Sequence, residues 1–113
     1  MRILLDECVN AGVKAAFPGH AVKVVSETGW RSAKDGTLLG YAQGQFDVFV
    51  TIDKRLEQQH ELTRMKLGFV IARVPSNEIG AYRPIFTALM EAAESVGSGE
   101  VRHVVSPEMR RLR

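Results

Sequence analysis

The stretch from Phe46 to Lys54 constrains the fold of this chain more than any other. It opens with a nearly continuous run of β-branched and aromatic residues, Phe46 to Val50, broken only by Asp47. Such a run is typical of a strand covered on both faces, the usual state of a central strand in a parallel sheet. The polar turn that follows, 51–54, leads into a helix-permissive segment. Asp53 is therefore predicted at the carboxyl edge of the sheet, where open α/β folds bind ligands.

A second apolar run that ends in acidic residues stands at the start of the chain. Ile3, Leu4 and Leu5 precede Asp6 and Glu7. This pattern predicts a first strand over residues 2–5. If both strands belong to one sheet, the carboxylates of Asp6 and Asp53 meet at the same edge, and two such carboxylates could begin a metal site.

Strand and helix patterns alternate along the rest of the chain. Strands are expected over residues 21–25, 68–74 and 101–105. Apolar residues at helical spacing, or a capping residue before them, predict helices over residues 9–17, 35–42, 54–66 and 84–96. Residues 107–112 are expected to form a short edge piece. This alternation favours a parallel sheet with helices on both of its faces.

The size and charge of the chain allow several classes of protein. A chain of 113 residues fits one domain, spanning residues 1–113. The net charge is only +2 and the pI is about 8.9, which permits nucleic-acid binding without indicating it. The basic residues gather at the end of the chain, at Arg102, Arg110, Arg111 and Arg113.

The cysteine content and the hydropathy pattern indicate a cytoplasmic protein. Cys8 is the only cysteine, which excludes an internal disulfide framework and a multi-cysteine zinc site. No apolar run approaches the roughly 18 residues that span a membrane, so no membrane association is expected. Asp6 and Glu7 interrupt the N-terminal apolar run, which therefore does not match a signal peptide.

Three aspartates, Asp6, Asp35 and Asp53, fall where the predicted topology places the carboxyl edge. Mg²⁺ and Mn²⁺ take oxygen ligands and keep several waters, so two or three carboxylates suffice to hold them. A metal bound there could polarise a phosphoryl oxygen and activate water. The alternative is structural, because each aspartate also precedes a predicted helix, where it could serve as a cap or interact with the helix dipole.

The other acidic residues near the motifs have weaker claims to the site. Glu7 is adjacent to Asp6, so the two side chains should point to opposite faces of an extended backbone, and Glu7 could at most support the site. Asp47 begins the central strand and is expected about 20 Å from Asp53, at the opposite edge of the sheet.

The remaining candidates have both structural and functional interpretations. Trp30, on a loop, could pack in the core or stack on a nucleotide base. Arg31, Lys34, Lys54 and Arg55 flank the acids and could bind phosphates or remain ordinary surface charges. Cys8 follows the acidic pair without a base partner, so it is predicted to be a buried, inert thiol.

The order of these motifs resembles the small PIN-like proteins, compact relatives of the PIN-domain nucleases. The resemblance runs nearly from end to end and is carried by residues 3–7, 29–35 with 38–42, 50–54, 68–74 and 104–110. It implies a three-layer α/β/α sandwich with a mainly parallel central sheet. It also implies that Asp6, Asp35 and Asp53 bind Mg²⁺ or Mn²⁺, with Thr51 as a polar support. The usual substrate is RNA, and many relatives are toxins of toxin–antitoxin pairs.

Three positions depart from the PIN-like pattern. Where the family's first motif commonly continues with asparagine and, two positions on, proline, this chain has Cys8 and Asn10. The aromatic residue that often follows the last acidic motif is replaced by Leu56. The aspartates are kept, and the departures concern the entrance of the predicted pocket.

The sequence leaves three functions open. The first is a metal-dependent endoribonuclease with Asp6, Asp35 and Asp53 as catalytic residues, RNA as substrate, an antitoxin as possible partner and a possible homodimer. Trp30, Arg31, Lys54 and Arg55 are its candidate RNA-binding residues. The second is a receiver-like signalling domain, which would also need a hydroxyl residue after its fourth strand and a lysine after its fifth. The third is a catalytically decayed module that binds RNA or a protein.

Overall fold

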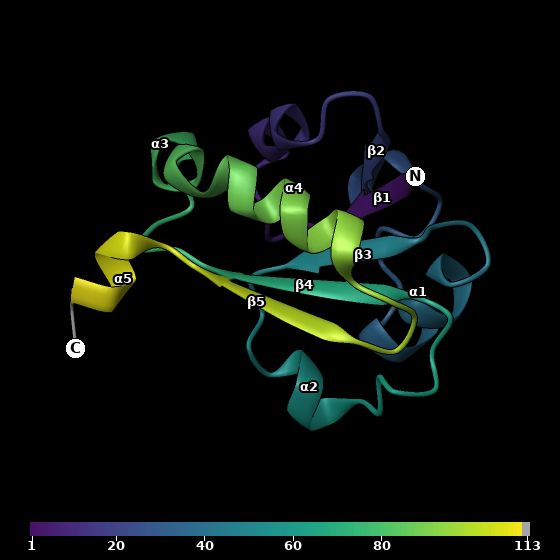
Figure 1. Ribbon diagram of the computed structural model, residues 1–113. Coiled ribbons are helices and arrows are strands. Elements are labelled where there is room, and N and C mark those ends of the chain that lie inside the picture. Colours follow the sequence, from purple (N-terminus) through teal and green to yellow (C-terminus); the bar gives the residue numbers. More distant parts are fainter. Residues whose placement is uncertain (112–113) are drawn as a thin grey trace.

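The centre of the molecule is a parallel sheet in the order β2-β1-β3-β4-β5. It is seen in a computed structural model that describes residues 1–111 (Figure 1). The five strands are β1 (Arg2–Leu5), β2 (Ala21–Val24), β3 (Val48–Thr51), β4 (Gly68–Arg73) and β5 (Val101–Val105). Each strand pair is parallel, which confirms the predicted fold class. The order reverses between β1 and β3, because the chain first adds β2 on one side of β1 and then returns to its other side.

Helical segments cover both faces of the sheet, as the strand–helix alternation predicts. One face is covered by η1 (Ala11–Ala16), α3 (Ile79–Tyr82), η3 (Arg83–Ile85) and α4 (Phe86–Ser95), and the other by α1 (Asp35–Ala42) and α2 (Leu56–Gln59). In Figure 1, α3 and α4 lie above the strands and α2 lies below them. Two further segments, η2 (Val25–Glu27) and α5 (Pro107–Arg111), follow β2 and β5.

Two apolar clusters, one on each face, hold the layers together. Ile3 and Leu5 of β1 pack with Leu89 of α4, whereas Leu4 packs with Leu38 of α1 and Phe49 of β3. This division follows from the alternation of side chains along a strand. All four residues of β3 are buried, as predicted for a strand covered on both faces.

Several predicted boundaries were wrong. Residues 54–66 form a helix only over Leu56–Gln59, because Leu56 and Leu62 are too few apolar residues to fix a long helix on the sheet. The predicted helix 84–96 is divided: the 3₁₀ turn η3 contains Pro84, whose missing N–H weakens an α-helix, and α4 follows it. The short piece expected over residues 107–112 is the helix α5 over Pro107–Arg111, and Leu112 and Arg113 lie outside the described residues.

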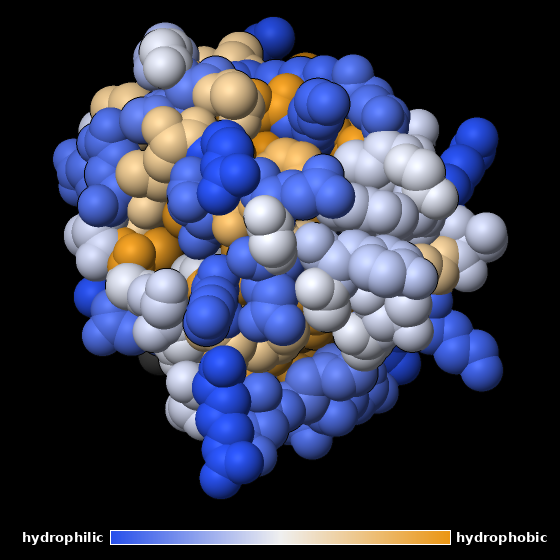
Figure 2. Space-filling model, turned by 90° about the vertical axis from the view of Figure 1, so that its right-hand side faces the viewer, coloured by the Kyte–Doolittle hydropathy of each residue, from blue (hydrophilic) through white to orange (hydrophobic). Residues whose placement is uncertain are grey.

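The surface at the amino ends of the strands is mostly hydrophilic. This is the right-hand side of Figure 1, and it faces the viewer in Figure 2, where apolar atoms occur in small groups between polar ones. Among the described residues, the exposed large hydrophobic side chains are Met1 and Tyr41. No helix within residues 1–111 is long and apolar enough to cross a membrane.

The loop between α4 and β5 depends on a glycine. Gly99 has φ of 76°, and its N–H donates a hydrogen bond to the Leu67 carbonyl at 2.9 Å. A Cβ added at this position would lie 2.3 Å from the Thr63 carbonyl oxygen. Both the left-handed backbone and the close approach therefore require glycine.

We expect Gly99→Ala to lower the free energy of unfolding by more than about 1 kcal/mol, because the variant needs both a strained φ and displacement of the Thr63 backbone. Gly80→Ala is the matched control: Gly80 lies in α3, and nothing would lie within 4 Å of its added Cβ. The control should be neutral or up to about 1 kcal/mol more stable. Urea unfolding of both variants measures the difference, and equal stabilities would contradict this account of the loop.

Candidate functional site

Asp6 and Asp53 follow the two adjacent strands between which the strand order reverses. Asp6 comes directly after β1, and its backbone N–H donates to the carbonyl of Val50 in β3 at 2.9 Å. Asp53 follows β3 by two residues. The alternation of side chains places Asp6 on the same face as Leu4, the face that α1 and α2 cover. Doubly wound sheets bind ligands at this point of strand reversal.

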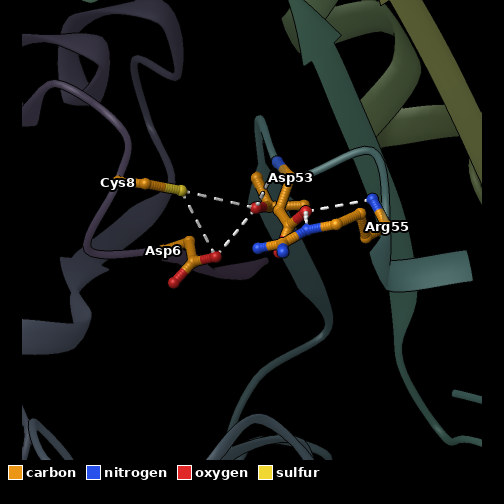
Figure 3. A network of polar contacts seen from close by, with 5 residues as sticks. Asp6, Cys8, Asp53 and Arg55 are labelled. Carbon is orange, nitrogen blue, oxygen red and sulfur yellow. Dashed lines mark hydrogen bonds and ion pairs between the residues drawn. The ribbon is translucent and has the colours of Figure 1, made fainter. Parts of the chain in front are cut away.

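The hydroxyl group of Thr51 connects the two aspartates. Thr51 is fully buried, and its Oγ1 donates a hydrogen bond of 2.8 Å to Oδ2 of Asp6. The same Oγ1 accepts a hydrogen bond of 3.1 Å from the backbone N–H of Asp53. In Figure 3 the Asp6 carboxylate points towards this contact, whereas the Asp53 carboxylate faces Arg55. One buried hydroxyl thus orients the Asp6 carboxylate and fixes the backbone of Asp53.

Arg55 holds the carboxylate of Asp53. Oδ1 of Asp53 accepts hydrogen bonds from the Arg55 backbone N–H at 2.9 Å and from Nε of Arg55 at 3.2 Å. These contacts lower the pKa of Asp53; the backbone hydrogen bond is the largest cause, and partial burial opposes it. Figure 3 shows the Arg55 side chain folded back towards Asp53. Asp53 is therefore held in its ionised form, with Oδ1 occupied.

Asp35 shares a crevice with Asp6. The two residues line one narrow crevice with Leu38, Leu39, Phe49 and Leu56, and this crevice has no room for a water molecule. Asp35 is the first residue of α1 rather than its N-cap, which is Lys34. No side-chain capping hydrogen bond is made at this helix start. The capping explanation therefore fits Asp53, which binds the N–H of Arg55 directly before α2, better than it fits Asp35.

The three aspartates have the right chemistry for a divalent cation but do not form a complete set of ligands. Within residues 1–111, no group of three or more His, Cys, Asp or Glu side chains is close enough to hold a metal ion. Asp6 and Asp53 nevertheless supply hard carboxylate oxygens at one edge of the sheet. Mg²⁺ is commonly held by one or two carboxylates, with waters and substrate phosphates completing its shell. The residues present fit that mode of binding.

The prediction that Cys8 is a buried thiol was wrong. Cys8 is exposed, and its Sγ lies 3.5 Å from Oδ2 of Asp6 and 3.6 Å from Oγ1 of Thr51. Partial burial of the sulfur is the largest cause that raises the thiol pKa, and the negative charge of Asp6 adds to it. Sequence spacing missed this contact because the turn after β1 returns the chain towards Thr51.

The other predicted residues do not join the aspartates. The Trp30 ring packs against Tyr41 and Phe46, with centroid distances of 5.7 and 6.0 Å, and Phe46 precedes β3 at the opposite edge of the sheet. Glu7 is exposed, and only its backbone N–H contacts Asp6. Arg31, Lys34 and Lys54 are exposed. Asp47 pairs with Arg2 at 3.3 Å, at the amino edge, as predicted.

Arg73 was not among the residues predicted at this edge of the sheet. Arg73 is the last residue of β4, on the same carboxyl edge as Asp6 and Asp53, and it lines a cavity that includes Lys54. The signal that could have found it is a charged residue at the end of an otherwise apolar strand.

We expect Thr51→Val to lower the free energy of unfolding by about 1–3 kcal/mol, because the valine keeps the volume but leaves Asp6 and the Asp53 N–H without the hydroxyl. The control is Thr37→Val, at an exposed position of α1, which should change stability by no more than about 0.5 kcal/mol. Urea unfolding measures both. If Thr51→Val is as stable as the control, the hydrogen bonds of the Thr51 hydroxyl contribute nothing to the free energy of unfolding.

Asp53 should titrate below the usual aspartate value of about 3.9. Because its folded pKa is depressed, its contribution to stability is complete above about pH 4 and is lost as the pH falls through the folded pKa. NMR titration of the Asp53 carboxyl carbon measures this directly. Arg55→Ala should bring the pKa of Asp53 only part of the way back to its usual value, because the backbone hydrogen bond from residue 55 remains. A wild-type Asp53 that titrates at the usual value would refute the contact with Arg55.

Comparisons with models of protein families, with curated proteins and with solved structures found no match to this chain. The resemblance to PIN-like proteins therefore rests on the order of the sequence motifs. The site itself consists of Asp6, Thr51 and Asp53 at the centre of the carboxyl edge, with Asp35 beside Asp6.

Proposed function

We propose that this protein is a metal-dependent endoribonuclease of the PIN-like type, and that it acts as the toxin of a toxin–antitoxin pair. The observation that carries the proposal is the joining of Asp6 and Asp53, from neighbouring strands, through the buried hydroxyl of Thr51. A strand-end cap needs no such connection. The connection sets the backbone of Asp53 beside the carboxylate of Asp6, so that both aspartates stand at one place on the carboxyl edge.

The residues have separate roles in this proposal. Asp6 and Asp53 would hold Mg²⁺ or Mn²⁺, with Asp35 as a third acid at the start of α1. A bound divalent ion supplies an activated water and polarises the phosphodiester. Thr51 keeps Asp6 oriented, and Arg55 keeps Asp53 ionised while its guanidinium offers positive charge to a phosphate. Lys54, exposed on the same loop, is a second cation for RNA.

A second candidate is a decayed PIN-like module that binds RNA or a protein without cleaving it. Two observations favour it: Asp53 is engaged by Arg55, and no group of three metal-binding side chains occurs within residues 1–111. The receiver-like alternative shares the strand order of doubly wound folds. However, Arg73 ends β4 where a hydroxyl residue is needed, and Val105 ends β5 where a lysine is needed.

The partners of the proposed nuclease are RNA, a cognate antitoxin and a second copy of the chain. Homo-oligomers usually form closed two-fold pairs, in which the same patch meets itself. Within residues 1–111, Tyr41 is a large aromatic side chain with 52% exposure, packed at a tilt against Trp30, and we propose that such a patch forms around it.

The proposal is tested by Mn²⁺ titration calorimetry on the wild type, Asp6→Asn and Asp53→Asn, with folding checked by circular dichroism. The matched control is Glu91→Gln, which removes an exposed carboxylate from α4. We expect the wild type and the control to bind Mn²⁺ and both aspartate variants to lose binding. RNA cleavage should fall by at least about 100-fold in the aspartate variants.

Two results would contradict the nuclease. The first is a wild type that binds no Mn²⁺ and cleaves no RNA with RNA and metal present together; this result would favour the decayed module. The second is cleavage that survives in folded Asp53→Asn protein, which would place the chemistry elsewhere.

A further inference from the structure

A cavity of about 240 Å³ lies at the carboxyl edge of the sheet, beside the aspartates. Its apolar lining comes from the ends of β3 and β4 and from α5: Ile52, Ala72, Val74 and Met109. Its polar lining consists of Lys54, Arg73, Ser76 and Asn77. An apolar wall with a few convergent polar groups is the usual composition of a ligand pocket. None of the three aspartates of the proposed metal site lines this cavity.

The cavity carries two positive charges and no negative one. Lys54 and Arg73 both line it, and none of its lining residues within the described chain is an Asp or a Glu. Neither cation forms an ion pair within residues 1–111, whereas Arg55, next in the chain after Lys54, is paired with Asp53. Two like charges at one cavity repel each other, and a bound anion would compensate both.

Arg73 is held in a position that suits an anion. Its Nε atom is buried and has no hydrogen-bond partner within residues 1–111. Its backbone is fixed as well, because its carbonyl accepts a hydrogen bond from the Ser106 N–H at 2.9 Å. A guanidinium group presents a rigid fork of N–H donors that matches the oxygens of a phosphate. Arg73 thus brings to the cavity a guanidinium group whose Nε makes no hydrogen bond within residues 1–111.

The two remaining polar residues have donors to spare. Oδ1 of Asn77 accepts hydrogen bonds from the Tyr82 hydroxyl and from the Asn10 N–H, which orients the amide and leaves its Nδ2 group as the donor. Oγ of Ser76 accepts from the Glu78 N–H at 3.3 Å, so its own proton is free to donate. Each of the four polar residues of the cavity therefore has a donor that makes no hydrogen bond within residues 1–111.

The cavity and the aspartates lie on two sides of one loop. Ile52 and Lys54 line the cavity, and Asp53 stands between them. Ile52 packs against the core cluster on the α4 side, whereas Asp53 follows Phe49 and Thr51 on the side of α1 and α2. A chain of phosphates that crosses the carboxyl edge would pass from the aspartates over this loop into the cavity.

We propose that Arg73, Lys54, Ser76 and Asn77 form a phosphate-binding subsite, which takes a backbone phosphate of the RNA next to the one at the aspartates. This inference rests on the proposed nuclease function, since it names RNA as the source of the phosphate. The subsite would position the strand and would not take part in the cleavage.

The test is the binding of a fluorescently labelled single-stranded RNA, followed by anisotropy in EDTA over a range of salt concentrations, so that neither metal binding nor cleavage enters. The variants are Arg73→Gln and Lys54→Gln. Lys66→Gln is the matched control, because Lys66 is an exposed cation near the start of β4, at the amino edge. A parallel calorimetric titration with inorganic phosphate, in a buffer otherwise free of phosphate, tests whether the subsite binds free phosphate instead of an RNA phosphate. Circular dichroism checks folding.

We expect each subsite variant to bind RNA about tenfold more weakly, which is the scale of a lost charged hydrogen bond. The slope of log K against log salt should decrease in magnitude by about 0.7 for each lost phosphate contact. Lys66→Gln should match the wild type. Because Lys54 is exposed, Lys54→Gln keeps the test valid even if Arg73→Gln fails to fold.

Two outcomes would overturn the subsite. Unchanged affinity and salt slope in folded Lys54→Gln and Arg73→Gln would remove it and leave the proposed nuclease intact, provided that cleavage still needs the aspartates. A wild type that binds inorganic phosphate but no RNA would overturn the assignment of the subsite to RNA, whereas the proposed function is decided separately by the Mn²⁺ titration and the cleavage assay.

Discussion

The pairing of β1 with β3 is the contact on which the rest of the structure depends. These two strands are the point where the strand order reverses, so the helices on the two faces diverge from this place and leave the carboxyl edge open. The pairing also brings Asp6 within reach of Thr51, which lies 45 residues later in the chain. Both faces of the pair are buried, and therefore neither strand can shift its register without exposing apolar side chains.

Much of the fold could be predicted from the sequence because apolar patterns decide which surfaces must be buried. The run through Phe49 and Val50 forms a central strand because no other environment suits so apolar a segment. The extent of the helices was harder to predict. The segment 54–66 contains too few apolar residues to fix a helix, so its turns are set by contacts such as the hydrogen bond from Lys66 N–H to Gln43, which periodicity does not reveal.

The candidate site could be predicted in part. The positions of Asp6 and Asp53 follow from strand ends, which the sequence indicates directly. The role of Thr51 as a hydrogen-bonded bridge needs three-dimensional geometry, and so does the exposure of Cys8. Arg73 could be placed at a strand end, but its cavity depends on α5 and on the loop held by Asn77. Contacts between segments far apart in the chain have no local signature.

The long sequence separation between Asp6 and Thr51 has a consequence for how the protein is made. All strand pairs of this sheet are parallel, and each requires a long connection before it can close. Parallel pairing of distant segments is slow, and a chain emerging from the ribosome carries Asp6 well before Thr51. The two aspartates therefore come together only when β3 has been synthesised and has paired with β1. Until that pairing, a growing chain contains Asp6 but not the arrangement of Asp6, Thr51 and Asp53, which forms late in folding.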